Sequence, residues 1–495
     1  MKKIIIVGGG IAGLSAGVYA AQSGFDVTIL EQHSIPGGFC TSWKRNGYLF
    51  EGGLHWLTGS SAQQPLNKVW RELGAIDDNT KIFTRDPFLI YDHHGQQAKL
   101  YRDVEKLRAH LCEISPEDKK EINKFCNDIK KFSKVTMPLT DIKGVKVKEK
   151  SRPKLSSLLS MLPVLAKFSK YSKITAAEYA ARFKNPVIRG LVGDMLDEYY
   201  PALFMFMSFG VFTSGDGGFL EGGSLKMTQN IANRFKSLGG KIQHNIKVEQ
   251  VLIENGKTVG VLVGGEKMQA DSVIVTTDTA VAIDRLFAAP LNESWTDKMR
   301  ALKPKSMVST FVCLGVEADL SDMPEVTNYF LDKPLTYAGK EHNVFGYEHY
   351  ATYESFAPKG CTAVTVTFMG DTYDFWKTHK ENGTYEDEKK KLADTVIEIL
   401  TEKLPQIKDK VAVVDVATPL TYERYCGSYH GGWMTKVGKG EKMESYPSKS
   451  ETVKGLYFAG YRLTPPGGLP VAAETGRKAA QHLCKDTNTV FQGKI

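Results

Sequence analysis

MKKIIIVGGGIAGLSAGVYAAQSGFDVTILE, residues 1–31, decides the fold of this chain. Lys3–Val7 is rich in β-branched residues, which predicts a strand buried on both faces, and Phe25–Leu30 predicts a second such strand. Between the two strands, the spacing G-x-G-x-x-G leads into an apolar helical pattern that starts at Ile11. These elements predict a Rossmann-type βαβ unit that ends at Glu31, 23 residues after the first glycine.

Each position of this motif has a chemical reason. Gly8 permits the tight turn, Gly10 lets the backbone approach a pyrophosphate, and Gly13 allows the helix to pack closely on the strand. The N-terminus of the helix presents unpaired N–H groups and a partial positive charge to the phosphates. Glu31 can accept hydrogen bonds from a ribose, which disfavours a 2′-phosphorylated nucleotide. We therefore predict a dinucleotide-binding site.

The same N-terminus imitates a secretory signal peptide, because two lysines precede an apolar run that ends in small residues. We reject that interpretation, since Gly8–Gly10 would interrupt the apolar helix and cleavage near Ala21 would destroy the nucleotide motif.

The seven cysteines are scattered along the chain and form no C-x-x-C pair. This pattern argues against a disulfide framework or a zinc site and favours a reducing compartment. We therefore expect a cytoplasmic protein without a metal site.

The positive charge of the chain is local. The chain has 495 residues, 42% of them apolar, enough for about three domains, and a formal net charge of +8. Residues 130–173 hold 12 Lys and Arg against Asp141 and Glu149, a balance of +10 that leaves the rest of the chain with a net charge near −2.

No apolar run reaches the roughly 18–20 residues of a spanning helix. The longest, Tyr199–Phe212, has 14 residues and contains Pro201, which indicates a buried or interfacial segment.

Residues 153–173 carry a helix-spaced apolar stripe flanked by lysines. Two interpretations stay open: a surface helix that covers the core, or a basic amphipathic element in peripheral contact with an anionic membrane. Nucleic acid is disfavoured, because the basic stretch has few interleaved aromatic residues and no recognisable binding motif. The stripe consists of Leu155, Leu158, Leu159, Leu162, Leu165 and Phe168, and the lysines are Lys154, Lys167, Lys170 and Lys173.

The stretch from Gly8 to Gly59 resembles the FAD-binding front of the flavin amine oxidase and phytoene desaturase superfamily. It has a glycine doublet, Gly37-Gly38, after the acid, followed by an aromatic-acid-x-Gly segment, residues 50–53, which lies against the flavin ring in that family. Phe39 follows the doublet where many members have arginine, a departure that concerns one charged contact near the pyrophosphate.

The resemblance continues through the middle of the chain. Residues 217–277 predict a glycine turn, a helix, a hairpin around Asn255-Gly256 and a buried strand over Asp271–Thr276. In the resembled family the backbone at the position of Val248 contacts the adenine. Residues 418–432, TPLTYERYCGSYHGG, resemble a segment shared by carotenoid desaturases, carotenoid isomerases and retinol saturases.

The C-terminal segment GLYFAGYRLTPPGGLP, residues 455–470, predicts a strand, a turn at Gly460 and a helix that starts near Leu469. In the resembled family the N-terminus of this helix faces the pyrimidine edge of the flavin, where it stabilises negative charge on the reduced ring. A nicotinamide dehydrogenase does not need this segment, so it favours FAD over NAD. The resemblance thus covers nearly the whole chain.

The cofactor expected is non-covalent FAD, since family members with covalent flavin use a cysteine in this C-terminal segment and Leu456–Pro470 has none. The predicted FAD-binding residues are Gly8, Gly10, Ala12, Gly13, Glu31, Gln32, Gly38, Phe39, Gly53, Leu54, His55, Val248, Thr276, Gly460, Tyr461, Gly468, Leu469 and Pro470.

His55 is the candidate catalytic residue, because it lies in the segment expected to face the flavin ring and can donate or accept a proton. The alternative is a packed histidine satisfied by backbone groups. Tyr422, Tyr425, Tyr429 and His430 can line a substrate cavity, although an aromatic strand is more often part of the core. We expect no catalytic triad, because the flavin carries the difficult chemistry.

The fold expected is α/β: a Rossmann-type FAD-binding domain of the glutathione reductase-like kind, with an inserted helical and mixed-sheet substrate domain. The FAD-binding domain is expected to be discontinuous, over residues 1–100, 217–285 and 411–495. Residues 101–216 are expected to form a helical lid or membrane-facing insert, and residues 286–410 the sheet and helix of the substrate domain.

Three functions compete. The first is a flavoenzyme that desaturates, saturates or isomerises a lipophilic polyene or isoprenoid, which the resemblance and the basic apolar insert favour. The second is an amine oxidase acting on a smaller amine. The third is a non-catalytic prenyl-binding protein, because Rab GDP-dissociation inhibitors share this fold; the intact glycine motif and C-terminal segment argue against it. The electron acceptor is left open.

Overall fold

The computed structural model of the chain describes residues 1–136, 139–148, 164–194 and 199–495. Its nucleotide-binding half is built on a five-stranded parallel sheet in the order β21-β13-β1-β2-β9. The strands are β1 (Lys3–Val7), β2 (Asp26–Leu30), β9 (Lys241–Gln243), β13 (Ser272–Val275) and β21 (Leu456–Phe458). The predicted βαβ unit and the two later strands of this half are thereby confirmed.

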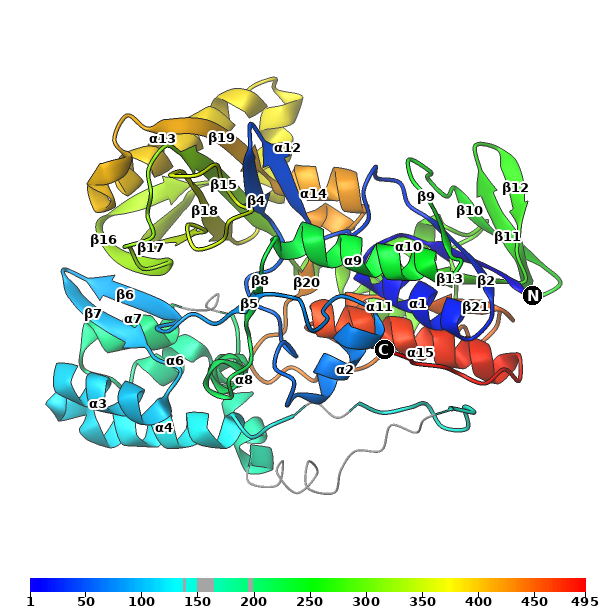
Figure 1. Cartoon of the computed structure of the whole chain (residues 1–495), viewed down its shortest axis with the longest axis horizontal. Helices are drawn as coiled ribbons and strands as arrows, with labels where there is room; N and C mark the ends of the chain where they lie inside the picture. Colours follow the sequence, from blue (N-terminus) through cyan, green and yellow to red (C-terminus); the bar gives the residue numbers. More distant parts are fainter. Residues whose placement is uncertain (137–138, 149–163, 195–198) are drawn as a thin grey trace.

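Three helices cover this sheet: α1 (Ile11–Gln22), α9 (Gly223–Ser237) and α15 (Leu469–Asp486). Helix α1 contacts both other helices and strands β1 and β2, which explains why it is apolar on all sides. It lies alongside α15 in Figure 1, and a Cβ on Gly476 would come within 2.4 Å of the Ala12 carbonyl oxygen. A glycine on α15 is therefore what brings the two helices so close together.

A seven-stranded mixed sheet forms the second layer, in the order β19-β15-β18-β17-β16-β6-β7 (Figure 1, left side, with β6 and β7 below the other strands). Its strands are β6 (Leu89–His93), β7 (Gln96–Leu100), β15 (Ser309–Val316), β16 (Val326–Tyr337), β17 (Lys340–His349), β18 (Thr362–Met369) and β19 (Val411–Ala417). Helices α12 (Tyr373–Glu381) and α13 (Tyr385–Lys403) pack against it, with Trp376, Val396 and Leu400 buried. Strands β15 to β18 and helix α13 lie within residues 286–410, where a sheet and a helix were expected.

Two boundaries differ from the predicted division of the chain. Residues 89–100 and 411–417 were assigned to the nucleotide half, but β6, β7 and β19 pair into the seven-stranded sheet. The reason is physical: a strand pattern shows which residues are buried but not which sheet supplies the hydrogen-bonding partner.

In its described residues, the helical insert contains α3 (Val104–Ile114), α4 (Lys119–Phe132), α6 (Ala176–Ala180), α7 (Pro186–Gly193) and α8 (Ala202–Thr213). Its core is aromatic, and α4 packs on α8 closely enough that a Cβ on Gly210 would lie 2.7 Å from the backbone of Phe132. Each fully buried phenylalanine, such as Phe125 or Phe206, contributes about 1.5–3 kcal/mol.

The apolar segment 199–212 was expected to be buried or interfacial, and most of α8 is indeed buried. In the described parts of the chain we find no helix with the length and hydropathy to cross a bilayer. Of the predicted leucine stripe, Leu155, Leu158, Leu159 and Leu162 lie outside the described residues.

The remaining elements connect these layers. The hairpin predicted around Asn255-Gly256 is confirmed, and it joins β10 to β11. The connecting elements are β3 (Ser42–Arg45), β4 (Tyr48–Glu51), α2 (Pro65–Glu72), β5 (Ile82–Phe83), β8 (Phe219–Leu220), β10 (Gln250–Glu254), β11 (Lys257–Val263), β12 (Glu266–Gln269), α10 (Thr279–Arg285), α11 (Thr296–Arg300), β14 (Ser306–Met307), α14 (Pro419–Cys426) and β20 (Met434–Thr435).

Candidate functional site

A cavity of about 1640 Å³ joins the nucleotide half to the space between the seven-stranded sheet and the helical insert. Ordinary small-ligand pockets measure about 300–1,000 Å³, so this cavity has room for a dinucleotide and a second long ligand. Sixteen of the predicted FAD-binding residues line it: Gly8, Gly10, Ala12, Glu31, Gln32, Gly38, Phe39, Gly53, His55, Val248, Thr276, Gly460, Tyr461, Gly468, Leu469 and Pro470.

Gly13 and Leu54, also predicted to bind FAD, do not line the cavity. A Cβ on Gly13 would lie 2.0 Å from the carbonyl oxygen of Gly8, so this glycine lets helix α1 pack on the turn rather than offering a surface to a ligand. Leu54 is fully buried in the core, and only its neighbours Gly53 and His55 reach the cavity.

The glycine turn after β1 is open toward the cavity. Gly8 has φ +104°, a conformation that favours glycine, and Thr276 donates from Oγ1 to the carbonyl oxygens of Val7 and Gly8 at 2.9 Å. A Cβ on Gly10 would meet nothing nearer than the Gly37 carbonyl oxygen at 3.8 Å. The space beside Gly10 at the N-terminus of α1 is thus free for a phosphate group.

Glu31 lies at the end of β2, where the nucleotide motif predicts it. Its carboxylate accepts hydrogen bonds from the backbone N–H of Gly9 at 2.6 Å and of His33 at 2.7 Å. Burial raises the pKa of Glu31, and these two backbone donors partly oppose the rise. The N–H of Ile246 donates to the Glu31 carbonyl oxygen, which brings the segment that contains Val248 to the same edge of the cavity.

The C-terminal segment closes the cavity from the other side. Gly460 follows β21 with φ +147°, and Gly467 and Gly468 have φ of +105° and +93° before α15 begins at Leu469. Since Gly468, Leu469 and Pro470 line the cavity, the N-terminus of α15 offers its partial positive charge there.

Phe39 is held by two tyrosines. Its ring stacks on Tyr422 with centroids 5.8 Å apart and meets Tyr461 edge-on at 6.2 Å. Tyr422 in turn donates its hydroxyl to the Gly52 carbonyl oxygen at 2.9 Å. Aromatic side chains therefore form the cavity wall, which we call the aromatic wall, at the position where the family resemblance implied a charged contact near the pyrophosphate.

Residues 419–426 form helix α14, so the alternative of an aromatic core strand around Tyr422 does not hold. Its capping box at Thr418 and the proline that follows are helix-start signals, which compete with the aromatic pattern. Tyr422, Tyr425 and Tyr429 line the cavity, whereas His430 is stacked on the rings of Tyr373 and Tyr429.

Glu51, the acid of the aromatic-acid-x-Gly segment, was not among the predicted site residues, yet it positions the segment that precedes His55. Its buried carboxylate accepts from the N–H groups of Gly53 and Leu54 at 2.8 and 2.9 Å, from Ser42 Oγ at 2.9 Å and from both N–H and Oγ of Ser224. Burial raises its pKa. The signal in the sequence was an acid at the end of an otherwise apolar strand.

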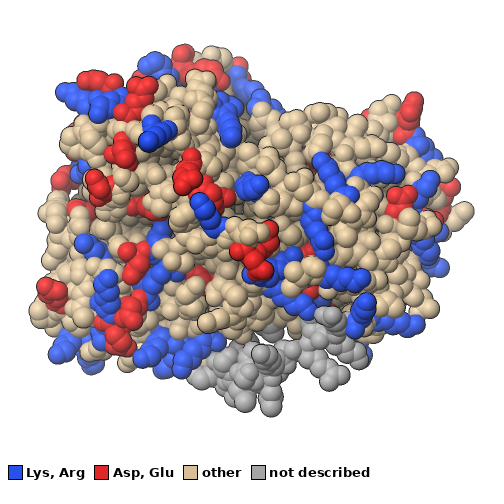
Figure 2. All heavy atoms as spheres, in the orientation of Figure 1, with Lys and Arg blue, Asp and Glu red and all other residues tan. Residues whose placement is uncertain are grey.

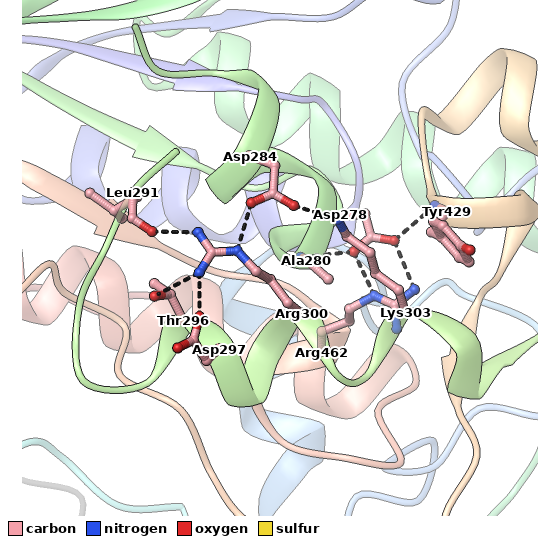
Figure 3. Close-up of polar contacts among 10 residues, drawn as sticks. All are labelled: Asp278, Ala280, Asp284, Leu291, Thr296, Asp297, Arg300, Lys303, Tyr429 and Arg462. Carbon is pink, nitrogen blue, oxygen red and sulfur yellow. Dashed lines mark hydrogen bonds and ion pairs between the residues drawn. The ribbon is translucent and has the colours of Figure 1, made fainter. Parts of the chain in front are cut away.

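A second omission is the ion pair between Asp278 and Arg462, whose side chains are both fully buried (Figure 3). Arg462 donates from Nε at 2.5 Å and from a terminal nitrogen at 2.9 Å, while Tyr429 donates its backbone N–H to Asp278 at 3.0 Å. Arg462 also donates to Ser306 and to the Leu302 carbonyl oxygen. The pair therefore holds the segment after β21 against the start of α10. The bonds to Leu302 and Ser306 hold the same segment against the residues that lead into the second sheet.

His55 lies in the cavity wall with its side chain 36% exposed, and its Nδ1 is 3.2 Å from Glu348 Oε2 on β17. Burial disfavours the imidazolium, but the hydrogen bond and negative charge of Glu348 outweigh burial and raise the pKa of His55. Burial also favours the neutral form of Glu348, but Arg85 and His55 lower its pKa to about 2. Of the two readings of His55, the structure thus shows a side-chain partner rather than a backbone one.

The far part of the cavity is apolar. On the helical side Phe132, Phe204 and Met207 face it, and on the sheet side Val326 and Val344 do. Among the described residues, no three His, Cys, Asp or Glu side chains are grouped in a way that could hold a metal ion. The wall suits a lipophilic ligand rather than a charged one.

Comparison with known proteins identifies relatives along almost the whole chain. Residues 11–484 match the family described as flavin containing amine oxidoreductase. The chain is 26% identical to prolycopene isomerase 1 of an Oncidium hybrid cultivar over 97% of this chain and 84% of that protein. It is 23% identical to the neurosporene-forming phytoene desaturase of Rhodobacter capsulatus, over 98% of this chain and 94% of that one.

Among solved structures, cyclohexylamine oxidase from Brevibacterium oxydans superimposes with a TM-score of 0.62 at 13% identity, over 98% of this chain and 99% of the other. At that identity the likeness concerns the fold alone.

Proposed function

The chain belongs to the flavin containing amine oxidoreductase family, and on that premise we propose that it is an FAD-dependent oxidoreductase acting on carbon–carbon bonds of a lipophilic polyene or isoprenoid. Desaturation, saturation and isomerisation are the reactions in question. One observation carries the proposal: a single cavity of about 1640 Å³ runs from the glycine turn of the nucleotide motif into an apolar chamber. The relatives named for prolycopene and phytoene support the substrate class.

The residues present fit FAD. The space beside Gly10 at the N-terminus of α1 would hold its phosphates, the N-terminus of α15 would face its pyrimidine edge, and the carboxylate of Glu31 would bind its ribose. When bound, the flavin supplies hydride transfer to or from carbon. The chain contributes orientation, through Glu51 and the aromatic wall at Phe39, and a water-poor chamber. We propose His55, which lines the cavity, as the group that holds or moves a proton.

The test of the reaction is anaerobic incubation of oxidised and of reduced enzyme with carotenoid and retinoid polyenes, followed by product mass. We expect a change of two hydrogens for desaturation or saturation, or an unchanged mass with altered retention for isomerisation. Conversion of amines such as cyclohexylamine instead would favour an amine oxidase, the second candidate, which the shared fold supports. A colourless purified protein would favour the non-catalytic prenyl-binding alternative.

We expect the FAD to be bound without a covalent bond. Leu456–Pro470 contains no cysteine, and two cysteines elsewhere, Cys40 and Cys426, line the cavity. Burial raises the pKa of Cys40 to about 12 and that of Cys426 further, so neither thiol forms a reactive thiolate at neutral pH. Denaturation and filtration should release all yellow colour. Colour retained on the precipitated chain would contradict this expectation.

We propose that an anionic membrane is a partner of this protein, which would contact it peripherally. Figure 2 shows Lys and Arg side chains along the lower edge of the molecule, beneath α3 and α4. Leu165 is 53% exposed, and Phe168, three residues later, lines the apolar chamber. Lys167 is not available for such contact, because it pairs with Asp128 at 2.8 Å. Lys170 and Lys173 remain as basic residues on the same segment.

The protein should therefore sediment with anionic liposomes at low salt and be released in part at high salt. Each basic residue near the surface contributes about 1 kcal/mol, so K170E/K173E should weaken binding while the flavin content stays unchanged. K377E/K380E on α12 is the matched control and should bind as the wild type does. If the wild type does not bind anionic liposomes at low salt, residues 153–173 act only as a lid and not as a membrane contact.

A further inference from the structure

Four charged side chains form a chain of contacts that begins in the cavity wall at His55 and Glu348 and continues behind it to Arg85 and Glu325, and we call it the ion chain. Glu325 Oε2 lies 2.5 Å from Nε of Arg85, whose terminal nitrogen lies 2.5 Å from Oε1 of Glu348. The other carboxylate oxygen of Glu348 is 3.2 Å from His55 Nδ1. The four residues come from four separate segments, so only the tertiary fold brings them together.

The charges of the ion chain alternate. The side chains of Arg85, Glu348 and Glu325 are only 7%, 12% and 20% exposed. With His55 protonated, two positive charges balance two negative ones; with His55 neutral, the ion chain keeps one uncompensated negative charge. Since an unpaired buried charge is costly, the arrangement favours the imidazolium form of His55.

We propose that Glu348 is the positioning residue for His55: held by Arg85, it fixes the imidazole by Nδ1, keeps the ring protonated and leaves Nε2 to exchange a proton with the occupant of the cavity. The inference rests on the proposed function, because it concerns the proton-transfer group of the same cavity. A neutral or freely rotating histidine would not be a ready proton donor at neutral pH.

Other titratable groups around His55 and Glu348 do not replace Glu348 in this role. Glu51, which also raises the pKa of His55, already accepts from three backbone N–H groups and from the hydroxyls of two serines. Tyr353 donates to Glu325. Tyr350, with a raised pKa, and His349, with a lowered pKa, also interact with Glu348 and Arg85, and both are neutral at pH 7. Arg102 also interacts with Arg85, but its guanidinium donates to the backbone carbonyl oxygens of four residues, those of Arg85, Phe212, Asp216 and Gly217.

The test is the titration of His55 in the flavin-bound protein, followed by NMR of side-chain-labelled histidine and assigned with H55Q. We expect a pKa above that of free histidine in the wild type. Glu348→Gln keeps the shape and the hydrogen bond but removes the charge, so the pKa of His55 should fall by about one to three units. Glu348→Asp should restore part of the loss.

Glu325→Gln is the matched control, because Glu325 shares Arg85 with Glu348 but does not contact His55. It should shift the His55 titration by much less than Glu348→Gln does. An unchanged titration in Glu348→Gln, or an equal shift in Glu325→Gln, would overturn the proposal, since either result means that Glu348 does not set the protonation of His55.

A second readout is the pH dependence of polyene conversion. Because protonated His55 is the proposed donor, the basic limb of the profile should move to lower pH in Glu348→Gln by the same number of pH units as the His55 titration, and Glu348→Asp should return it toward the wild type. The titration needs no substrate. Failure to convert any polyene would therefore count against the proposed function, while the titration alone decides the role of Glu348.

Discussion

Gly10→Val is expected to give a folded protein that binds no flavin. Gly10 has φ −70° and ψ 180°, which valine adopts readily, and its Cβ would meet no protein atom closer than 3.8 Å. The added methyl groups would instead fill the space at the N-terminus of α1 that a pyrophosphate requires. Affinity for FAD should fall by about 100-fold or more, equivalent to about 2.7 kcal/mol.

The measurements are the ratio of flavin to protein absorbance after purification and the melting temperature of the apoprotein. Gly10→Val should be colourless and should melt where the apo wild type melts. Gly13→Val is the contrasting variant: its Cβ would lie 2.0 Å from the Gly8 carbonyl oxygen, so it should lose stability even without flavin. A fully yellow Gly10→Val protein would refute the assignment of the nucleotide motif.

Asp278→Asn is expected to cause the largest loss of stability. The substitution leaves the guanidinium of Arg462, which is fully buried, without its counter-charge, and breaking such a pair costs about 3–5 kcal/mol. The double variant Asp278→Asn/Arg462→Met removes both charges and should recover much of that loss. Urea unfolding of the apoproteins measures these differences.

The control for this prediction is the exposed pair of Lys298 and Glu444, which are 2.9 Å apart with Lys298 63% exposed. Lys298→Met should change the free energy of unfolding by less than about 1 kcal/mol. If Asp278→Asn is no more destabilising than Lys298→Met, then hydrogen bonds rather than the charges hold the segment after β21.

The fold and the cofactor half of the site follow from local sequence. The turn at Gly8, the helix from Ile11, the acid at Glu31 and the helix from Leu469 are each marked by residue types within a short stretch of sequence. Glycine spacing, strand periodicity and helix starts are properties of short segments. For that reason the βαβ unit and its later strands could be predicted, and the predicted residues gather around one cavity.

Only the tertiary structure determines which residues form the part of the cavity opposite the predicted flavin-binding half. Glu348 and Arg85 are 263 residues apart in the sequence, yet they share an ion pair, and Asp278 meets Arg462 across 184 residues. Neither pair has a local pattern, because a buried charge takes its partner from whichever segment the fold brings near. Strands β6, β7 and β19 joined the second sheet for the same reason. Strands and buried charges take their partners from segments far away in the sequence. The periodicity of side chains along one segment indicates only which of its faces is buried.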